Sequence, residues 1–334
     1  MSSLRAFRNY LMVLAAAIVG LMALGAGVRT MRAGLSCPDW PLCFGKVIPD
    51  FHVGVWFEFV HRAYAGLVAL MFLGAMIWAW RSREVPRIAK WASVVSAVFL
   101  TLQILMGALT VLWLVKALVV TTHLLLATVF LVGVWVMLIA VQLRLQPMNF
   151  ERRAPVGLRA LSLALPLLIF VQIAIGGLVA STYSGSVCVD WPLCNGQWVP
   201  TWRGAIGLQI IHRFVAYALT LVILAMAIWA WKSPRIDTHW KKILNVQAGL
   251  VLAQLVCGVA NLMMYIPPSI TVLHQSLAVA LLGASLWVAT RAYLESFKSA
   301  ESPAASRVPR SEMPADPDSK REFGAGSGKL PATP

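Results

Sequence analysis

The sequence has little charge for its length. Only 12% of its 334 residues are charged, whereas 59% are hydrophobic. A soluble protein of this size needs more charged surface than that. Several apolar runs exceed the ~18 residues that mark a membrane-spanning helix. The composition therefore excludes an ordinary soluble enzyme and predicts a membrane protein.

Acidic residues are especially scarce. The chain has 13 aspartates and glutamates against 28 lysines and arginines, and its formal net charge is +15. An excess of basic residues can indicate binding to nucleic acid, but such binding needs a basic domain. Here the basic residues lie in short loops and in a C-terminal tail, between apolar runs. That distribution follows the positive-inside rule of membrane proteins, so we expect no nucleic-acid partner.

Two further absences narrow the function. The five cysteines include no Cys-x-x-Cys pair, which disfavours a thiol-disulfide oxidoreductase. No cleavable signal peptide is evident, because the apolar stretch after Arg5 and Arg8 runs for about 20 residues and is too long for the core of one. We expect this stretch to be an uncleaved first span.

One stretch of the chain occurs twice. Residues 37–43 read Cys-Pro-Asp-Trp-Pro-Leu-Cys, and residues 188–194, 151 positions later, read Cys-Val-Asp-Trp-Pro-Leu-Cys. The same offset relates Gly45 to Gly196, Pro49 to Pro200, His61 to His212, Arg62 to Arg213, Trp80 to Trp231, Gln103 to Gln254, Gly107 to Gly258 and His123 to His274. A constant register over so long a span indicates a duplicated unit without net insertions.

Hydropathy predicts eight membrane spans. They lie at residues 9–29, 54–80, 91–113, 117–143, 160–181, 205–231, 242–264 and 269–294. Basic residues cluster before the first span and in the connections after the second, fourth and sixth spans. All these clusters fall on one side of the membrane, which is therefore cytoplasmic. Both cysteine loops then lie on the extracytoplasmic side.

The predicted fold is an all-α membrane protein. Residues 1–146 and 155–296 each form a four-helix bundle. The two bundles lie side by side about a pseudo-two-fold axis along the membrane normal. Residues 147–154 form a cytoplasmic linker. Residues 297–334, rich in Pro, Ser, Ala, Gly and charge, form a disordered cytoplasmic tail.

Four histidines lie inside the predicted spans at matching depths. His61 and His123 each fall about 10 Å below the outer end of their span, and His212 and His274 repeat this arrangement. A histidine in hydrocarbon is costly and usually functional. A single one is equally well explained by a hydrogen bond to another helix. Four of them, paired in depth and repeated in register, favour a bound ligand.

Iron porphyrin is the ligand that suits two facing imidazoles. Zinc needs four protein ligands, or three and water. Haem iron needs only axial ligands, since the porphyrin supplies four nitrogens, and a four-helix bundle is a suitable frame. We therefore expect one haem site in each half, with the four histidines as axial ligands. Arg62 and Arg213 follow two of these ligands and are expected to pair with haem propionates. The alternative for both arginines is snorkelling to lipid headgroups.

The two halves differ beside the first histidine of each pair. Glu58 lies three residues before His61 on the same helical face, whereas Gln209 precedes His212. A carboxylate at membrane depth is a functional signal, so we expect the first half to hold the reactive site and the second an electron-transfer or structural haem. The alternative is that Glu58 only pairs with Arg62 or a neighbour.

The loop cysteines form two close pairs on the oxidising side, where disulfides are expected. Each disulfide is interpreted either as a structural staple or as a redox-active group beside the reactive haem. Cys257 lies inside an apolar run and is expected to pack in the core. Gly107 and Gly258 permit close approach of a helix or flat ligand, one turn from glutamines that are expected to hydrogen-bond within the bundle.

These motifs together resemble one known family. The Cys-x5-Cys loops containing Trp-Pro-Leu-Cys, the Glu-Phe-Val-His-Arg segment at 58–62 and four histidines in a duplicated eight-span chain resemble haem A synthase over about residues 9–294. The resemblance implies oxidation of the C8 methyl group of haem O to a formyl group, giving haem A for cytochrome oxidases. Two successive hydroxylations would give an alcohol and then a hydrated aldehyde that loses water.

The resemblance also implies residue roles. Glu58 matches the catalytic carboxylate of the family. The first-half pair would lie at the haem O/haem A site, and the second-half pair would bind a haem b that passes electrons. The residues matching loop disulfides are Cys37 with Cys43 and Cys188 with Cys194.

Partners and location follow from the same resemblance. We expect haem O as substrate, membrane lipid around the spans, and an electron donor that the sequence does not identify. Haem O synthase, cytochrome oxidase assembly factors and a second copy of the chain are further candidate partners. The expected location is the bacterial plasma (inner) membrane, with multiple spans and both termini cytoplasmic. Competing interpretations are a di-haem b electron carrier, a haem chaperone or exporter, and a thiol-disulfide oxidoreductase.

Overall fold

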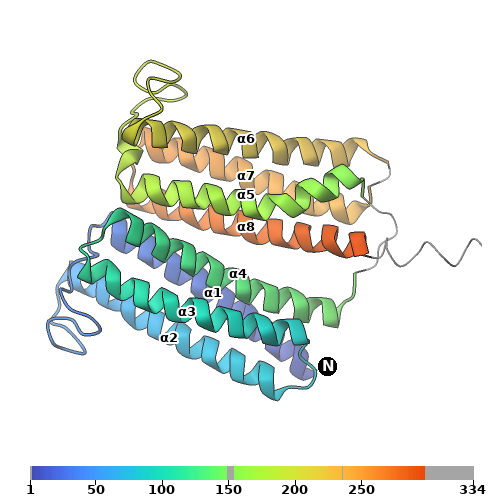
Figure 1. The fold of residues 1–334 in the computed structure, drawn as a ribbon, viewed down its shortest axis with the longest axis horizontal. Helices are drawn as coiled ribbons and strands as arrows, with labels where there is room; N and C mark the ends of the chain where they lie inside the picture. The colour runs from blue at the N-terminus through green and yellow to red at the C-terminus, as the bar shows by residue number, and fades with distance from the viewer. Residues whose placement is uncertain (1, 149–153, 235, 298–334) are drawn as a thin grey trace, which may run out of the picture. The chain divides into compact units, whose positions relative to one another are not determined.

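The chain folds into long helices, as the hydropathy predicts (Figure 1). The structure, a computed structural model, describes residues 2–148, 154–234 and 236–297. Its helices are α1 (Ser2–Thr30), α2 (Val53–Arg81), α3 (Arg87–Leu112), α4 (Ala117–Leu145), α5 (Val156–Ser181), η1 (Ser184–Ser186), α6 (Gly204–Lys232), α7 (Thr238–Met263) and α8 (Pro268–Phe297). All eight α-helices are long and apolar enough to cross a membrane. The predicted all-helical, multi-span fold is therefore confirmed.

Several helices begin one to two turns before the apolar runs that identified them. α1 begins at Ser2 instead of residue 9, and α3, α5 and α7 also start early. Hydropathy marks the part of a helix that lies in hydrocarbon, whereas the hydrogen-bonded helix continues through the headgroup region. Local signals set the actual starts. Pro86 directly precedes α3, and the carboxylate of Asp237 accepts the Trp240 N–H at 3.0 Å to cap α7.

Helices α1 to α4 close into a ring. α1 packs against α2 and α4, and α3 packs against α2 and α4. Their shared core includes the fully buried Leu11, Leu14 and Leu131. In the second half α6 packs between α5 and α7, around a core that contains Leu165 and Ile223. Van der Waals packing between helices and interhelical hydrogen bonds hold such bundles together in lipid.

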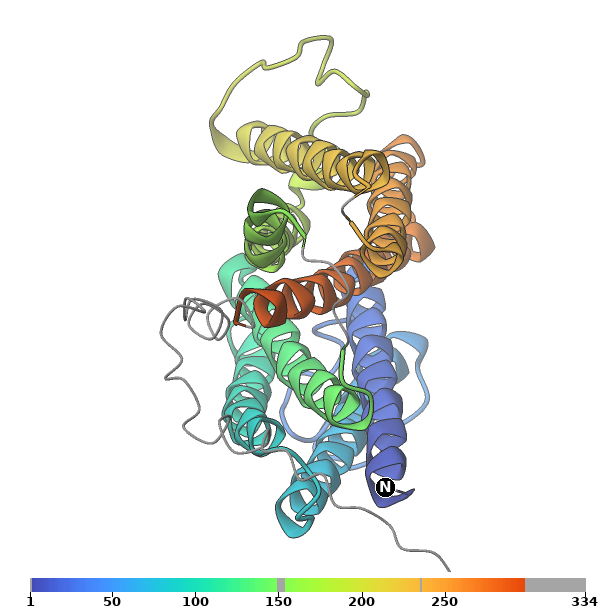
Figure 2. The same cartoon turned by 90° about the vertical axis from the view of Figure 1, so that its right-hand side faces the viewer.

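The two halves touch along α4, α5 and α8 (Figure 2). The hydroxyls of Thr121 and Ser181 lie 2.9 Å apart, which joins α4 to α5. The side chain of Gln275 on α8 donates to the Met22 carbonyl of α1 at 3.0 Å. Residues 1–295 thus form one compact unit. A pseudo-two-fold axis along the membrane normal and the division at 147–154 stay predictions.

The backbone repeats the sequence duplication. Left-handed φ angles occur in pairs at the 151-residue offset, at Arg32 and Tyr183, Phe44 and Asn195, Gly45 and Gly196, Leu114 and Tyr265, and Val115 and Ile266. Left-handed backbone is uncommon outside glycine, so such pairs indicate that each turn was copied with its geometry. Both cysteine loops lie at the same end of the helices, opposite the N-terminus (Figure 1). Of the predicted linker and tail, 149–153 and 298–334 lie outside the described residues.

Candidate functional site

Each half contains one cavity lined by its histidine pair. His61 and His123 line a cavity of about 650 Å³ in the first half. His212 and His274 line a cavity of about 480 Å³ in the second half. Both volumes fall in the range of small-molecule and cofactor sites, roughly 300–1,000 Å³. Each cavity thus brings together the two histidines of its half, and iron binding by them stays a prediction.

A glycine on a neighbouring helix faces each imidazole ring. A Cβ atom built on Gly25 of α1 would lie 2.9 Å from Cε1 of His61, and one on Gly107 of α3 would lie 3.1 Å from Cε1 of His123. The second half repeats this arrangement. A Cβ built on Gly176 would lie 3.0 Å from Cε1 of His212, and one built on Gly258 would lie 2.9 Å from Cε1 of His274. These separations are tighter than ordinary van der Waals contact. Larger side chains at the four glycines would therefore displace the rings.

Glutamine side chains orient three of the rings. Gln103 Nε2 lies 3.3 Å from His123 Nε2, and Gln254 stands in the same relation to His274. Gln172 reaches Nδ1 of His212 at 3.1 Å and has no counterpart in the first half, where its position is Leu21. A partner on one ring nitrogen sets the tautomer and leaves the other nitrogen to bind a metal.

The donor set fits an iron porphyrin. The Nδ1 atoms of His61, His123 and His274 are buried without a hydrogen-bond partner among the described residues. No group of three His, Cys, Asp or Glu side chains gathers as a metal site in the part of the chain that the structure describes. Two imidazoles with free nitrogens in an apolar cavity suit a metal whose other ligands come from a macrocycle.

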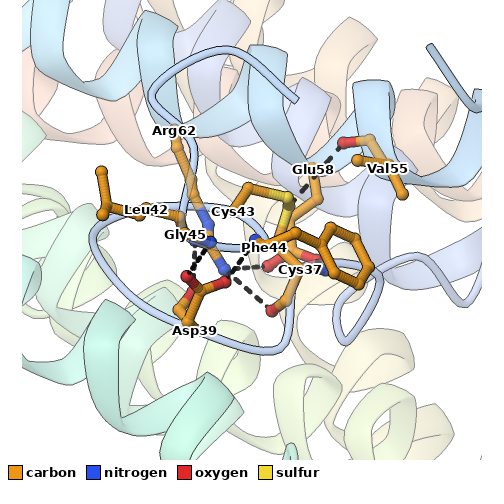
Figure 3. The surroundings of a disulfide bond; sticks show 9 residues. All are labelled: Cys37, Asp39, Leu42, Cys43, Phe44, Gly45, Val55, Glu58 and Arg62. Carbon is orange, nitrogen blue, oxygen red and sulfur yellow. Dashed lines mark hydrogen bonds and ion pairs between the residues drawn. A yellow bond between two sulfur atoms is a disulfide. The ribbon is translucent and has the colours of Figure 1, made fainter. Parts of the chain in front are cut away.

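Arg62 fastens the first cysteine loop to α2 (Figure 3). Its guanidinium donates to the carbonyl oxygens of Asp39 at 2.7 Å, Leu42 at 2.7 Å and Cys37 at 3.3 Å. These bonds give the arginine a loop-binding role that the sequence interpretation missed. Propionate binding by Arg62 stays a prediction, and most of the donors of its guanidinium are already in use.

The second loop is fastened in the same way. Arg213 donates to the carbonyl oxygens of Asp190 at 3.2 Å, Leu193 at 2.7 Å and Cys188 at 3.3 Å. Both arginines therefore bind equivalent atoms 151 residues apart. These arginine bonds hold each cysteine loop against the helices of its own half. The loop tryptophans then line the cavities, Trp40 the first and Trp191 the second.

In the first half, the carboxylate of Glu58 also binds the arginine and the cysteine loop. Its side chain is buried, Oε1 accepts from Arg62 at 2.5 Å, and Oε2 accepts the Cys37 backbone N–H at 2.8 Å. It also lines the cavity of His61. Gln209 occupies the equivalent position and lines the second cavity, but its Oε1 is buried without a partner among the described residues. A carboxylate thus lines the first cavity and an amide the second, as the sequence difference predicts. The ion pair with Arg62 is the contact that the alternative, purely structural interpretation of Glu58 named, and a catalytic role stays a prediction.

Both predicted disulfides are formed. The sulfur atoms of Cys37 and Cys43 lie 2.02 Å apart, and those of Cys188 and Cys194 lie 2.01 Å apart. Cys257 is free and buried, as expected for a packing residue. None of the four loop cysteines lines either histidine cavity, whereas Cys37 contacts Glu58 through its backbone N–H. This contact favours a structural role for the first disulfide in holding the carboxylate.

An aspartate within each loop stabilises its turn. Asp39 accepts the N–H groups of Phe44 at 2.7 Å and Gly45 at 2.8 Å, where φ is left-handed at both residues. The Gly45 N–H, followed by the Phe44 N–H and the Arg62 guanidinium, lowers the pKa of the Asp39 carboxyl, although desolvation opposes this. Asp190 is held in the same way in the second loop, and its pKa is lowered mainly by the Gly196 N–H.

The lowered pKa predicts acid-sensitive loops. A carboxyl whose pKa falls on folding contributes stability above its unfolded pKa of about 4, and this stability is lost as the pH falls through the folded value. We expect backbone hydrogen exchange in residues 37–45, corrected for its intrinsic pH dependence, to accelerate only below about pH 4. Asp39→Asn should accelerate exchange in this loop at neutral pH.

Asp190→Asn is the matched control for that experiment. It should loosen residues 188–196 and leave the first loop protected. Equal exchange in the first loop of Asp39→Asn and the unaltered chain at neutral pH would contradict the assigned role of the carboxylate.

Comparison with known proteins agrees with these features. The family described as cytochrome oxidase assembly protein matches residues 8–286. A protein named heme A synthase from Shouchella clausii is 31% identical over 248 residues, covering 72% of this chain and 81% of the relative. Relatives of the same name come from Halalkalibacterium halodurans, 31% identical over 71% of this chain and 80% of the relative, and Rhizorhabdus wittichii, 27% identical over 84% and 92%. This chain therefore belongs to the cytochrome oxidase assembly protein family.

Proposed function

We propose that this chain is a haem A synthase, which oxidises the C8 methyl group of haem O to a formyl group. The methyl carbon gains one oxygen atom and loses four electrons overall, and an oxidant from outside the chain, dioxygen or a redox partner, accepts these electrons. Two successive hydroxylations give an alcohol and then a hydrated aldehyde, which loses water. Relatives named heme A synthase along most of the chain support this function. The haem O that enters is the substrate, and haem A is the product.

The observation that carries the proposal is the single carboxylate in the linings of two cavities that each hold a histidine pair. Glu58 lines the cavity of His61 and His123, and Gln209 replaces it in the other. A carboxylate accepts a proton released as the methyl group is oxidised, whereas a glutamine amide does not. We therefore assign the first cavity to haem O and catalysis.

The residues of the first cavity have separate roles. His61 and His123 bind the iron of the substrate and fix the porphyrin between α2 and α4. Glu58 accepts a proton on its carboxylate. Arg62 and the Cys37 N–H orient that carboxylate, because each binds a different one of its oxygens. Trp40 and Pro41 of the first cysteine loop also line this cavity.

The second cavity is assigned to a resident haem b. His212 and His274 would hold the iron, and Gln172 would fix the ring of His212. Bound there, haem b would supply one-electron redox chemistry. Gln209 keeps this cavity without a carboxylate, consistent with binding alone.

We also propose an orientation in the bacterial plasma membrane. Basic residues at the N-terminus and in the connections between α2 and α3 and between α6 and α7 place that end in the cytoplasm by the positive-inside rule. The two cysteine loops then lie on the extracytoplasmic side, where disulfides persist.

Mass spectrometry of extracted haem tests the function. The full chain is expressed in a host that makes haem O but has no haem A synthase of its own. Haem A and its hydroxylated precursor should appear only when the chain is present. Haem O that remains unchanged beside a haem-loaded protein would point to an electron carrier or a haem chaperone instead, and would contradict the proposal.

A further inference from the structure

The two cavities share a wall. Seven residues line both of them, namely Arg29, Arg32, Leu124, Gly177, Ala180, Tyr183 and Gln275. They come from the end of α1, from α4, from α5 and the turn after it, and from α8. Most are apolar or small. Arg29 and Arg32 are the charged members, so a single pair of cations faces both sites.

These two arginines have no acidic partner among the described residues. The ion pairs found there join Lys46 to Asp50, Arg62 to Glu58, and Arg291 to Asp237 and Glu295. Arg29 is half-buried and lies near Tyr183, while Arg32 is exposed. A half-buried guanidinium without a counter-charge is costly and is stabilised by an anion.

Other cations near the cavities are already engaged. Arg62 and Arg213 each donate to three loop carbonyl oxygens, and Arg62 also pairs with Glu58. Glu58 is the acidic residue that lines the first cavity, and the second cavity has none among its described lining residues. Arg29 and Arg32 are therefore the cations left to bind an anionic group of a ligand.

Arg29 lies close to the level of the histidines along the helix axes. Arg29 lies one helical turn, roughly 6 Å, beyond Gly25, which faces His61. The equivalent position one turn beyond Gly176, which faces His212, is Ala180 on the shared wall. Arg29 therefore lies about one helical turn from the level of His61, toward the cysteine-loop end, and it lines both cavities. The second half supplies Ala180 and Tyr183 at the positions of the two arginines, so only the first half contributes cations.

We propose that Arg29 and Arg32 form one carboxylate-binding wall that serves both cavities. The inference rests on the proposed function: each cavity binds a porphyrin, and the propionates of both porphyrins point to this wall. Guanidinium groups bind carboxylates through paired hydrogen bonds and stay charged. Two ligands that bind the same cations interact electrostatically. A substitution of Arg29 or Arg32 should therefore change the ligand affinity of both cavities.

Haem b and its dimethyl ester provide the test, because esterification removes the propionate charges and leaves the iron unchanged. Visible-absorption titrations use the full chain in lipid nanodiscs. His212→Ala with His274→Ala leaves only the first site, and His61→Ala with His123→Ala leaves only the second. At each isolated site the ester should bind at least about tenfold more weakly than haem b.

Arginine substitutions should cancel that difference. Arg29→Gln with Arg32→Gln should bring the affinities for haem b and its ester to within about twofold at both sites, mainly by weakening haem b. Arg29→Lys keeps the charge without the paired donors and should retain part of the difference. Arg83→Gln, at an exposed position in the connection between α2 and α3, is the matched control and should retain all of it.

The outcomes separate this inference from the proposed function. An ester difference that persists at both sites without Arg29 and Arg32 would overturn the shared wall, and the arginines would then serve lipid headgroups. Loss of the difference at one site only would also overturn it. Haem that fails to bind to the unaltered chain would instead overturn the proposed function. Thermal unfolding of each variant shows whether it is folded, and the single substitutions replace the double one if it is not.

Discussion

Glu58→Gln is expected to lower haem A formation by roughly 10²–10⁴-fold, the usual contribution of a general acid or base. The substitution gives the first cavity the same side chain as the second. Its amide oxygen still accepts the Cys37 N–H, and Arg62 keeps its three loop carbonyl acceptors. The fold and both histidine pairs should therefore survive. The measurement is mass spectrometry of extracted haem, with the absorption bands of the purified chain recorded in parallel.

The duplicated half offers a matched control for this experiment. Gln209→Glu should leave the product yield nearly unchanged, and adding it to Glu58→Gln should not restore activity, because the second cavity lacks the substrate. Undiminished haem A from Glu58→Gln would show that no proton acceptor is needed at this position. Restored activity in the double variant would show that the two cavities are interchangeable.

Gly258→Val is expected to empty the second cavity. A Cβ at this position already lies 2.9 Å from Cε1 of His274, so a branched side chain forces the ring away from its place. Disturbing the surroundings of a metal ligand costs roughly 10–100-fold in metal affinity. Retention of haem at the His212–His274 site should fall by about that factor, whereas the His61–His123 site should keep its ligand. The haem-to-protein ratio and the low-spin ferric EPR signals measure both.

Gly249→Val is the matched control on the same helix. A Cβ built on Gly249 meets nothing within 4 Å. Gly249→Val therefore changes the helix propensity of α7 in the same way as Gly258→Val, but it does not contact an imidazole ring. It should retain haem at both sites. Gly25→Val should give the mirror result and empty the first site. Normal haem content in Gly258→Val would mean that the imidazole does not depend on the glycine beside it.

Much of the site was predictable because its signals are local or repeated. The histidine pairs, the Glu58–Gln209 difference and the two disulfides each follow from residue type and a constant offset of 151 residues. Gly25 and Gly176 obey the same offset, and so do Asp39 and Asp190. The repeat could therefore have indicated these four residues, and the sequence interpretation did not single them out. The positions of the histidines do not show which glycines face the imidazole rings or which aspartates stabilise the loops.

Other features depend on atoms that meet across helices. Arg62 follows a histidine in sequence, and its position suggested propionates, yet its guanidinium reaches back about 20 residues to loop carbonyl oxygens. Gln172 and the wall at Arg29 and Arg32 have no duplicate, so the repeat gave no hint of them. Gln172 meets His212 where α5 packs on α6, whereas the wall is built by residues of α1, α4, α5 and α8 that line both cavities.

Composition and register by themselves determined a multi-span helical protein with two histidine-bearing halves. The length of an apolar run identifies a membrane span, and the repeat identifies equivalent residues in the two halves. Both features follow from the order of residues along the chain. The tertiary structure decided which cations are engaged, which glycines face the imidazoles, and that one pair of arginines faces both cavities. Those outcomes depend on the distances between side chains of different helices, and no spacing along the chain encodes such distances directly.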